Sequence, residues 1–140
     1  MSLLISLAVG LGACANPDPQ LMVVSMPGCV FQGPSSMDPG SLRITLRAEG
    51  LGVYGLVLLR LPGSRSYDDL VEHVEARDGV WDPPDWATLA ADLKVGDEGQ
   101  DPSTSETVEL GDGEHAVVCI EYPYDDGEAV TTPTRRLVVG

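Results

Sequence analysis

Two neighbouring stretches, residues 42–48 and 53–61, constrain the fold of this chain most. The first, LRITLRA, alternates apolar and polar residues, which gives a β-strand one apolar and one solvated face. The second, VYGLVLLRL, is apolar on both faces, as in a strand that is covered from both sides, and Pro62 and Gly63 end it. The two patterns together predict a mainly β chain.

Further strands are expected on either side of this pair. Residues 21–26 (LMVVSM) are rich in β-branched side chains, and residues 29–31 resume the strand after a bend at Pro27. Residues 32–40 are predicted to form a loop. Residues 104–110 alternate, and a tight turn at 111–113 predicts a hairpin with residues 114–122. A last strand is expected at Leu137 to Val139.

One helix is predicted from Ser66 to Arg77. Ser66 can cap its start, and apolar residues recur on one face at helical spacing, namely Tyr67, Leu70, Val71 and Val74. Asp85 is predicted to cap a second short helix that runs through Leu93. Trp81 and Trp86 flank the turn between them, either as a ligand platform or, more often for such pairs, as a hydrophobic lid.

The net charge of the chain limits the classes of binding partner that it can have. The chain has 140 residues, enough for one domain with a sizeable core, and a formal net charge of −14 from 22 acidic and 8 basic residues. Nucleic acid is an unfavourable partner, because phosphate binding needs Lys and Arg. The insertion 68–101 holds eleven of the 22 acidic residues. The negative net charge of the chain serves solubility or, alternatively, provides an acidic face for a basic partner or for cations.

The first residues have the pattern of an export signal. An apolar run at residues 3–13 is too short to span a bilayer and is followed by Cys14 and a proline-rich stretch. Residues 11–14 resemble a bacterial lipobox, which implies a signal peptide at 1–13, a lipid on Cys14 and a tether at 14–20. Cleavage after Ala15 with plain secretion is the rival, and an ordinary buried terminal segment is a third interpretation.

If export removes Cys14 or attaches a lipid to it, Cys29 and Cys119 remain as a pair in a compartment that permits disulfides. A bridge between them would close a long loop. Two buried thiols, or a free Cys119 available to a metal, are the alternatives.

Residues 21–140 resemble the cupredoxin family, in particular its exported bacterial members. A strand ending Leu-x-x-Leu-Arg-Leu is matched at 56–61, and a Pro-Pro-x-Trp element at 83–86. The run Leu-x-x-Gly-x-Tyr-x-x-x-Cys is matched by Leu110, Gly113, His115 and Cys119. The resemblance implies a Greek-key β-sandwich with one short helical insertion.

The resemblance also implies where copper ligands should lie. A type 1 site needs two imidazoles, a thiolate and a weak axial ligand. The first family histidine falls on Tyr54 and the cysteine on Cys119, and no His or Met follows Cys119. Tyr54 and Cys119 are therefore interpreted as vestigial positions, with no metal or other cofactor expected.

The remaining candidate ligands favour ordinary roles. His115 takes the place of the family's corner tyrosine, which favours a hydrogen-bonded structural histidine. His73 is expected on the solvated side of the helix. Residues 122–128 (YPYDDGE) offer oxygen ligands for calcium but lack the spacing of known calcium loops, which favours a solvated turn.

The sequence thus predicts a non-enzymatic, exported domain without type 1 copper, a monomer at the cell envelope that binds another protein or a ligand. Contact with the membrane would run only through the lipid on Cys14. Alternatives are a protein that binds copper or another metal through Cys119 with unconventional ligands, and a purely structural envelope domain.

Overall fold

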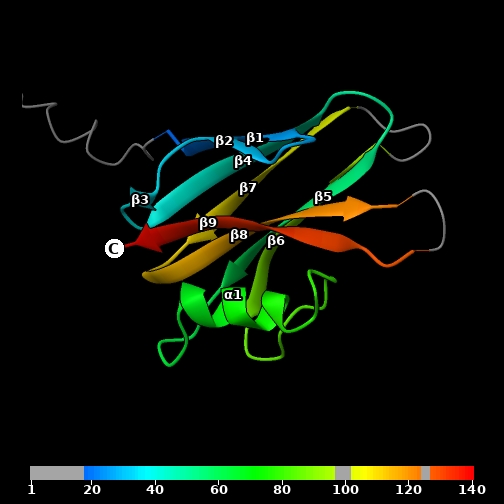
Figure 1. The fold of residues 1–140 in the computed structure, drawn as a ribbon. Coiled ribbons are helices and arrows are strands. Elements are labelled where there is room, and N and C mark those ends of the chain that lie inside the picture. The colour runs from blue at the N-terminus through cyan, green and yellow to red at the C-terminus, as the bar shows by residue number, and fades with distance from the viewer. Residues whose placement is uncertain (1–17, 97–101, 124–126) are drawn as a thin grey trace, which may run out of the picture.

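The computed structural model describes residues 18–96, 102–123 and 127–140, with only the backbone of residues 132–134. The signal segment 1–13 and most of the tether 14–20 lie outside the described residues. The described chain forms two sheets and one helix (Figure 1). Its elements are β1 (Gln20–Met26), β2 (Val30–Gln32), β3 (Ser36–Met37), β4 (Gly40–Ala48), β5 (Val53–Arg60), α1 (Tyr67–Glu75), β6 (Thr88–Val95), β7 (Ser103–Leu110), β8 (Gly113–Tyr122) and β9 (Val130–Val139).

The two sheets pack against each other as a sandwich. One has the strand order β2-β1-β4-β7, and the other has the order β3-β9-β8-β5-β6. The pairs β1 with β4 and β3 with β9 are parallel, and the remaining pairs are antiparallel. The predicted fold class, a mainly β sandwich with one short helical insertion, is confirmed.

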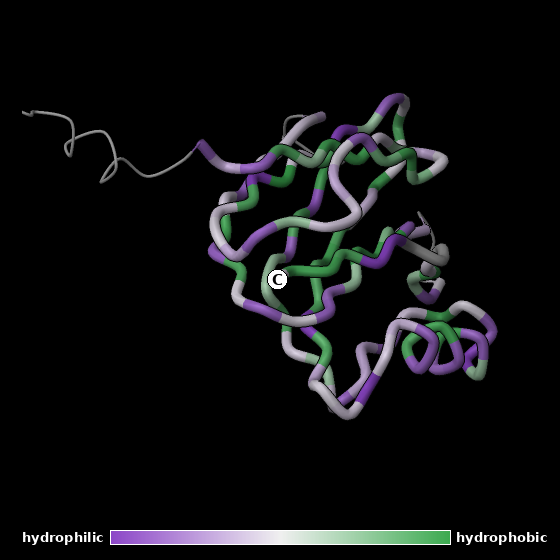
Figure 2. Tube along the Cα trace, turned by 90° about the vertical axis from the view of Figure 1, so that its left-hand side faces the viewer, coloured by the Kyte–Doolittle hydropathy of each residue, from purple (hydrophilic) through white to green (hydrophobic). Residues whose placement is uncertain are grey.

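The main core lies between the sheets. The alternation in β4 turns Leu42, Ile44 and Leu46 inward, where each is 0% exposed. They meet inward side chains of β5 and β8, among them Leu56 and Val117. Hydrophobic stretches accordingly follow the strands, while the connections are more hydrophilic (Figure 2). The pattern at residues 42–48 therefore predicted the core side of this strand correctly.

A second apolar cluster covers the outer face of the five-stranded sheet. Residues of β5 and β8 that point away from the main core, such as Val57, Leu59 and Val118, pack here under Leu70 of α1. This double coverage is what residues 53–61 predicted, since a strand in the middle of such a sheet has no solvated face.

Helix α1 forms where the sequence predicted it. Ser66 is the N-cap: its Oγ accepts a hydrogen bond from the Asp69 amide at 3.3 Å, and the Asp69 carboxylate accepts one from the Ser66 amide at 2.8 Å. This reciprocal capping box satisfies two amides that a helix start leaves without partners. Leu70 is the one fully buried residue of the helix, and it anchors the helix to the sheet.

Two predicted elements are wrong. No helix begins at Asp85, because residues 88–95 form β6: Ala91, Leu93 and Val95 are buried and alternate with exposed Asp92 and Lys94. The two-residue period fits a sheet edge and outweighs the capping potential of Asp85.

The hairpin at residues 111–113 is also wrong. Strand β7 pairs with β4, whereas β8 pairs with β5 and β9, so the turn carries the chain from one sheet to the other. The burial patterns explain why β7 and β8 lie in different sheets. Strand β7 is mostly exposed, whereas β8 is buried over six consecutive residues, so β8 has to lie in the centre of the larger sheet, where both faces are covered.

Two boundaries also differ. The last strand starts at Val130 rather than Leu137, because β8 supplies backbone partners along that length, as in the pair Glu121 with Val130. The predicted loop at 32–40 contains the two-residue strand β3, which pairs with the end of β9.

Candidate functional site

Cys119, the residue on which a metal site would depend, is part of a disulfide. It lies in the middle of β8, is 0% exposed, and is bonded to Cys29 in the turn between β1 and β2. The two Cα atoms are 6.1 Å apart, within the usual range for a disulfide, across a separation of 90 residues. The predicted bridge is confirmed, and it links the two sheets.

Tyr54 faces the same core as Cys119. In the register of β5 against β8, Leu56 lies opposite Cys119 and Tyr54 is the next residue along β5 on that face. The Tyr54 side chain is 6% exposed, and its ring lies over Gly52, where a Cβ atom would overlap it. The sandwich thus brings Tyr54 and Cys119, the two positions that the sequence interpretation singled out, to one core.

These residues do not fit a type 1 copper centre. The Cys119 sulfur already has a covalent partner, so it offers no thiolate. His115 lies four residues before it in the same strand, about 13 Å away along the chain. His73 is on α1, outside the five-stranded sheet. Among the described residues, no group of three His, Cys, Asp or Glu side chains is placed to hold a metal ion. Residues 124–126 of the predicted calcium or solvated turn lie outside the described chain.

His115 is a buried, hydrogen-bonded residue at the start of β8. It is 1% exposed, and its Nδ1–H donates to the carbonyl of Gly113 at 3.3 Å. Burial lowers the pKa of His115, the Gly113 carbonyl opposes that shift, and the nearby Arg60 charge adds to it. The structural role predicted for this histidine agrees with these contacts.

The prediction for His73 is wrong, because its ring faces the tryptophan turn and is not simply solvated. Its Nε2–H donates to the carbonyl of Asp82 at 2.6 Å, and its Nδ1 accepts from Arg77 at 3.1 Å. Arg77 also pairs with the Asp82 carboxylate at 3.1 Å. The ring packs edge-on against Trp86, with centroids 6.4 Å apart. These contacts hold the turn against α1.

Both tryptophans contribute to the outer cluster, which supports their interpretation as a lid. They differ in their surroundings. The Arg65 guanidinium lies over the Trp86 ring, 5.0 Å from its centroid, a distance typical of a cation–π contact. No described cation lies over Trp81.

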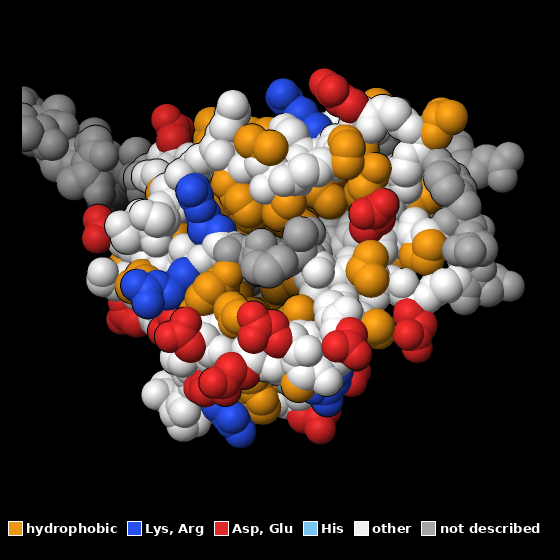
Figure 3. All heavy atoms as spheres, viewed as in Figure 1, with side chains coloured by type: hydrophobic (Ala, Val, Ile, Leu, Met, Phe, Trp, Pro, Cys, Tyr) orange, Lys and Arg blue, Asp and Glu red, His pale blue; other side chains and the backbone are white. Residues whose placement is uncertain are grey.

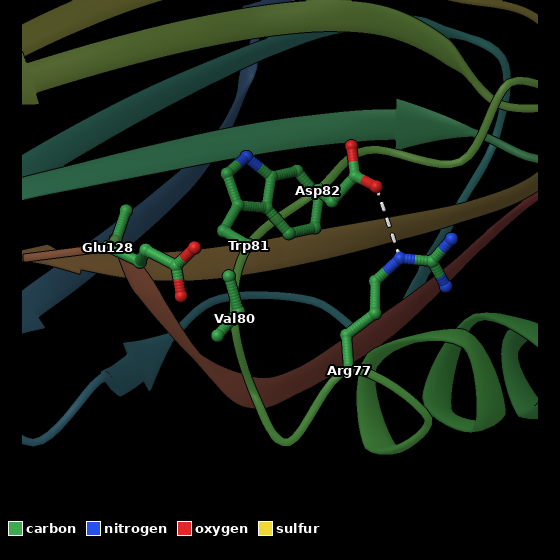
Figure 4. Close-up of a pocket in the computed structure, with 6 residues that line it drawn as sticks. Arg77, Val80, Trp81, Asp82 and Glu128 are labelled. Atoms are coloured by element: carbon green, nitrogen blue, oxygen red, sulfur yellow. Dashed lines mark hydrogen bonds and ion pairs between the residues drawn. The ribbon is translucent and has the colours of Figure 1, made fainter.

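Trp81 instead borders an open groove of about 620 Å³ (Figure 4). The groove forms because residues 79–81 pair with residues 129–131: the Trp81 amide donates to Ala129 and the Thr131 amide to Gly79, each at 2.8 Å. This brings Glu128 to one side of the indole, while the Arg77–Asp82 ion pair lies on the other. Val80 and Ala129 complete the lining.

The surroundings of the groove are acidic. Between Tyr67 and Trp86 the chain carries seven carboxylates and one arginine. Figure 3 shows acidic side chains gathered over the part of the surface that α1 and its connection to β6 occupy. The sequence predicted this acidic insertion but not the groove, since the pairing of residues 79–81 with 129–131 leaves no local pattern.

The solved structures that are similar to this chain include two auracyanins. Auracyanin B is 20% identical with a TM-score of 0.42, over 90% of this chain and 93% of that one. A dithionite-reduced auracyanin from the photosynthetic bacterium Roseiflexus castenholzii is 15% identical with a TM-score of 0.43, over 86% and 94%. Likenesses at this level carry no argument about what the chain does. No family model and no curated protein matches the sequence. In the described part of the chain, α1 is too short to cross a membrane, and no membrane-spanning helix is found.

Proposed function

We propose that this chain is an exported, non-enzymatic binding module of the cell envelope that holds no type 1 copper. One observation carries the proposal: the sulfur of Cys119 is bonded to Cys29. The residue that would have to serve as a thiolate ligand is therefore a structural crosslink, and Tyr54 is buried in the same core.

The same bridge supports export. Disulfides persist in oxidising compartments and are rare where thiols are kept reduced. The apolar run at residues 3–13, followed by Cys14, supplies the matching signal, with a lipid on Cys14 or plain secretion as its two outcomes. Globomycin-sensitive labelling of Cys14 by palmitate supports the lipid anchor, and release of the unlabelled protein into the medium contradicts it.

The hydrogen-bond partners of the two described histidines support a binding role rather than catalysis. The hydrogen bonds of His73 and His115 go to backbone carbonyls and to Arg77, so neither ring is placed to activate a hydroxyl nucleophile. What the surface does offer is the groove beside Trp81, with apolar and charged groups close together.

Copper titration tests the proposal. Cu(II) added to the oxidised protein is expected to give no intense visible band, because a charge-transfer band needs a thiolate bound to the metal. The matched control is Cys119→Ser, which removes the sulfur at this position. A strong visible band in the parent protein after Cu(II) is added, abolished by Cys119→Ser, overturns the proposal in favour of a metal site at Cys119.

A further inference from the structure

The groove beside Trp81 is a fixed feature of the fold. Its floor is apolar, with Val80, Trp81 and Ala129, and two backbone hydrogen bonds of 2.8 Å hold its two walls together. Trp81 is half-buried in the outer cluster, so its ring position is set by packing. A ligand would therefore meet a preorganised surface, which lowers the entropic cost of binding.

The side chains that line the groove carry a net negative charge, from two carboxylates and one guanidinium. Glu128 is exposed and forms no ion pair with a described lysine or arginine. The Asp82 carboxylate on the other side is paired with Arg77, which leaves Glu128 as the unpaired charge of the groove. The carboxylates of the acidic insertion add to the negative potential around it, and such a potential attracts cationic ligands.

The neighbouring tryptophan indicates which cation suits this surface. Trp86 has the guanidinium of Arg65 over its ring, whereas Trp81 has no described cation over its own. An arginine is planar, stacks on an indole and forms two parallel hydrogen bonds with a carboxylate. Trp81 and Glu128 are the two groups that such a side chain needs.

We propose that this groove binds an arginine side chain from a basic segment of a partner protein. The guanidinium stacks on Trp81 and pairs with Glu128, and its aliphatic part packs along Val80 and Ala129. The inference deepens the proposed binding function and rests on it for the existence of a partner, but the contacts that it assigns to the arginine are made by these four residues.

The experiment uses two short capped peptides, Gly-Arg-Gly and its citrulline counterpart, which keeps the shape but carries no charge. The indole N–H signals of the full chain are followed by NMR during titration with each peptide, and Trp81→Phe assigns the two signals. We expect the arginine peptide to shift the Trp81 signal at millimolar concentrations and the citrulline peptide to bind at least about fivefold more weakly.

Variants locate the contact. Glu128→Gln is expected to weaken arginine binding about fivefold, because a charge-assisted pair becomes a neutral one. Glu106→Gln, the same change on β7 of the other sheet, is expected to leave the affinity unchanged. Trp86→Phe leaves Trp81 as the remaining indole and should bind like the parent protein.

Three results would overturn the inference: equal binding of both peptides, equal weakening by Glu128→Gln and Glu106→Gln, or no shift of the Trp81 signal. A copper band together with selective arginine binding would overturn the copper-free function and leave the groove assignment standing. Lack of a copper band together with lack of arginine binding would leave the copper-free function standing and overturn the groove assignment.

Discussion

At the scale of single residues, His115 is the fully buried polar side chain of the described chain. Its Nδ1–H has a carbonyl partner, so the neutral ring is satisfied. Protonation would place a charge in a dry site that faces Arg60, and this is why burial and that charge lower its pKa.

This pKa shift predicts a dependence of stability on pH. Because the pKa of His115 is lower in the folded chain, the unfolded chain takes up a proton first, and stability is lost as pH falls below about 6.5. His115→Asn keeps a donor near the Gly113 carbonyl but does not titrate. Urea unfolding at about pH 7.5 and 5.5 should show a larger loss for the parent than for this variant. The same loss in both proteins would contradict the assignment.

At the scale of elements, the capping box fixes the start of α1, and α1 covers the outer cluster through Leu70. Ser66→Ala is expected to lower the free energy of unfolding by about 1 kcal/mol, because the Asp69 amide loses its acceptor. Ser64→Ala, an exposed serine two residues earlier, is the control and should be nearly neutral. Urea unfolding measures both, and equal effects would show that the cap does not stabilise the helix.

The elements that sequence reasoning predicted correctly are those with local causes. The cap at Ser66 and the alternation at residues 42–48 each depend on neighbours within a few positions, so both can be read directly. Residues 88–95 also alternate, and this two-residue period outweighs the capping potential of Asp85, on which the predicted helix depended.

What sequence could not predict depends on contacts between distant segments. The turn at 111–113 has the composition of a hairpin, but its outcome is decided by which sheet covers β8. Likewise, nothing in residues 128–131 indicates that they meet residues 79–81, so Glu128 was not a candidate beside Trp81. By contrast, the Cys29–Cys119 bridge was predictable, because only two cysteines remain after Cys14 is set aside.

At the scale of the whole molecule, the bridge joins the turn between β1 and β2 to the centre of the other sheet. The double variant Cys29→Ala/Cys119→Ala is expected to lose roughly 4 kcal/mol of unfolding free energy, because a long loop in the unfolded chain is no longer closed. The shift of the urea midpoint measures this loss.

Dithiothreitol supplies the control for the bridge. It should destabilise the parent protein by a similar amount and leave the double variant unchanged, since that variant has no bridge to reduce. A parent protein whose mass does not change on reduction, and whose urea midpoint equals that of the double variant, would show that the bridge does not form in solution.

The pairing that builds the groove also affects how the molecule meets its own copies. Strand β9 would otherwise present a long free edge, and such edges promote aggregation between chains. Residues 79–81 pair with one end of that edge and β3 with the other. Between them the sequence has Pro133, which has no amide to donate. We therefore expect the acidic insertion also to limit edge-to-edge association of the sandwich, so shortening it should promote fibrillar assembly as well as remove the groove.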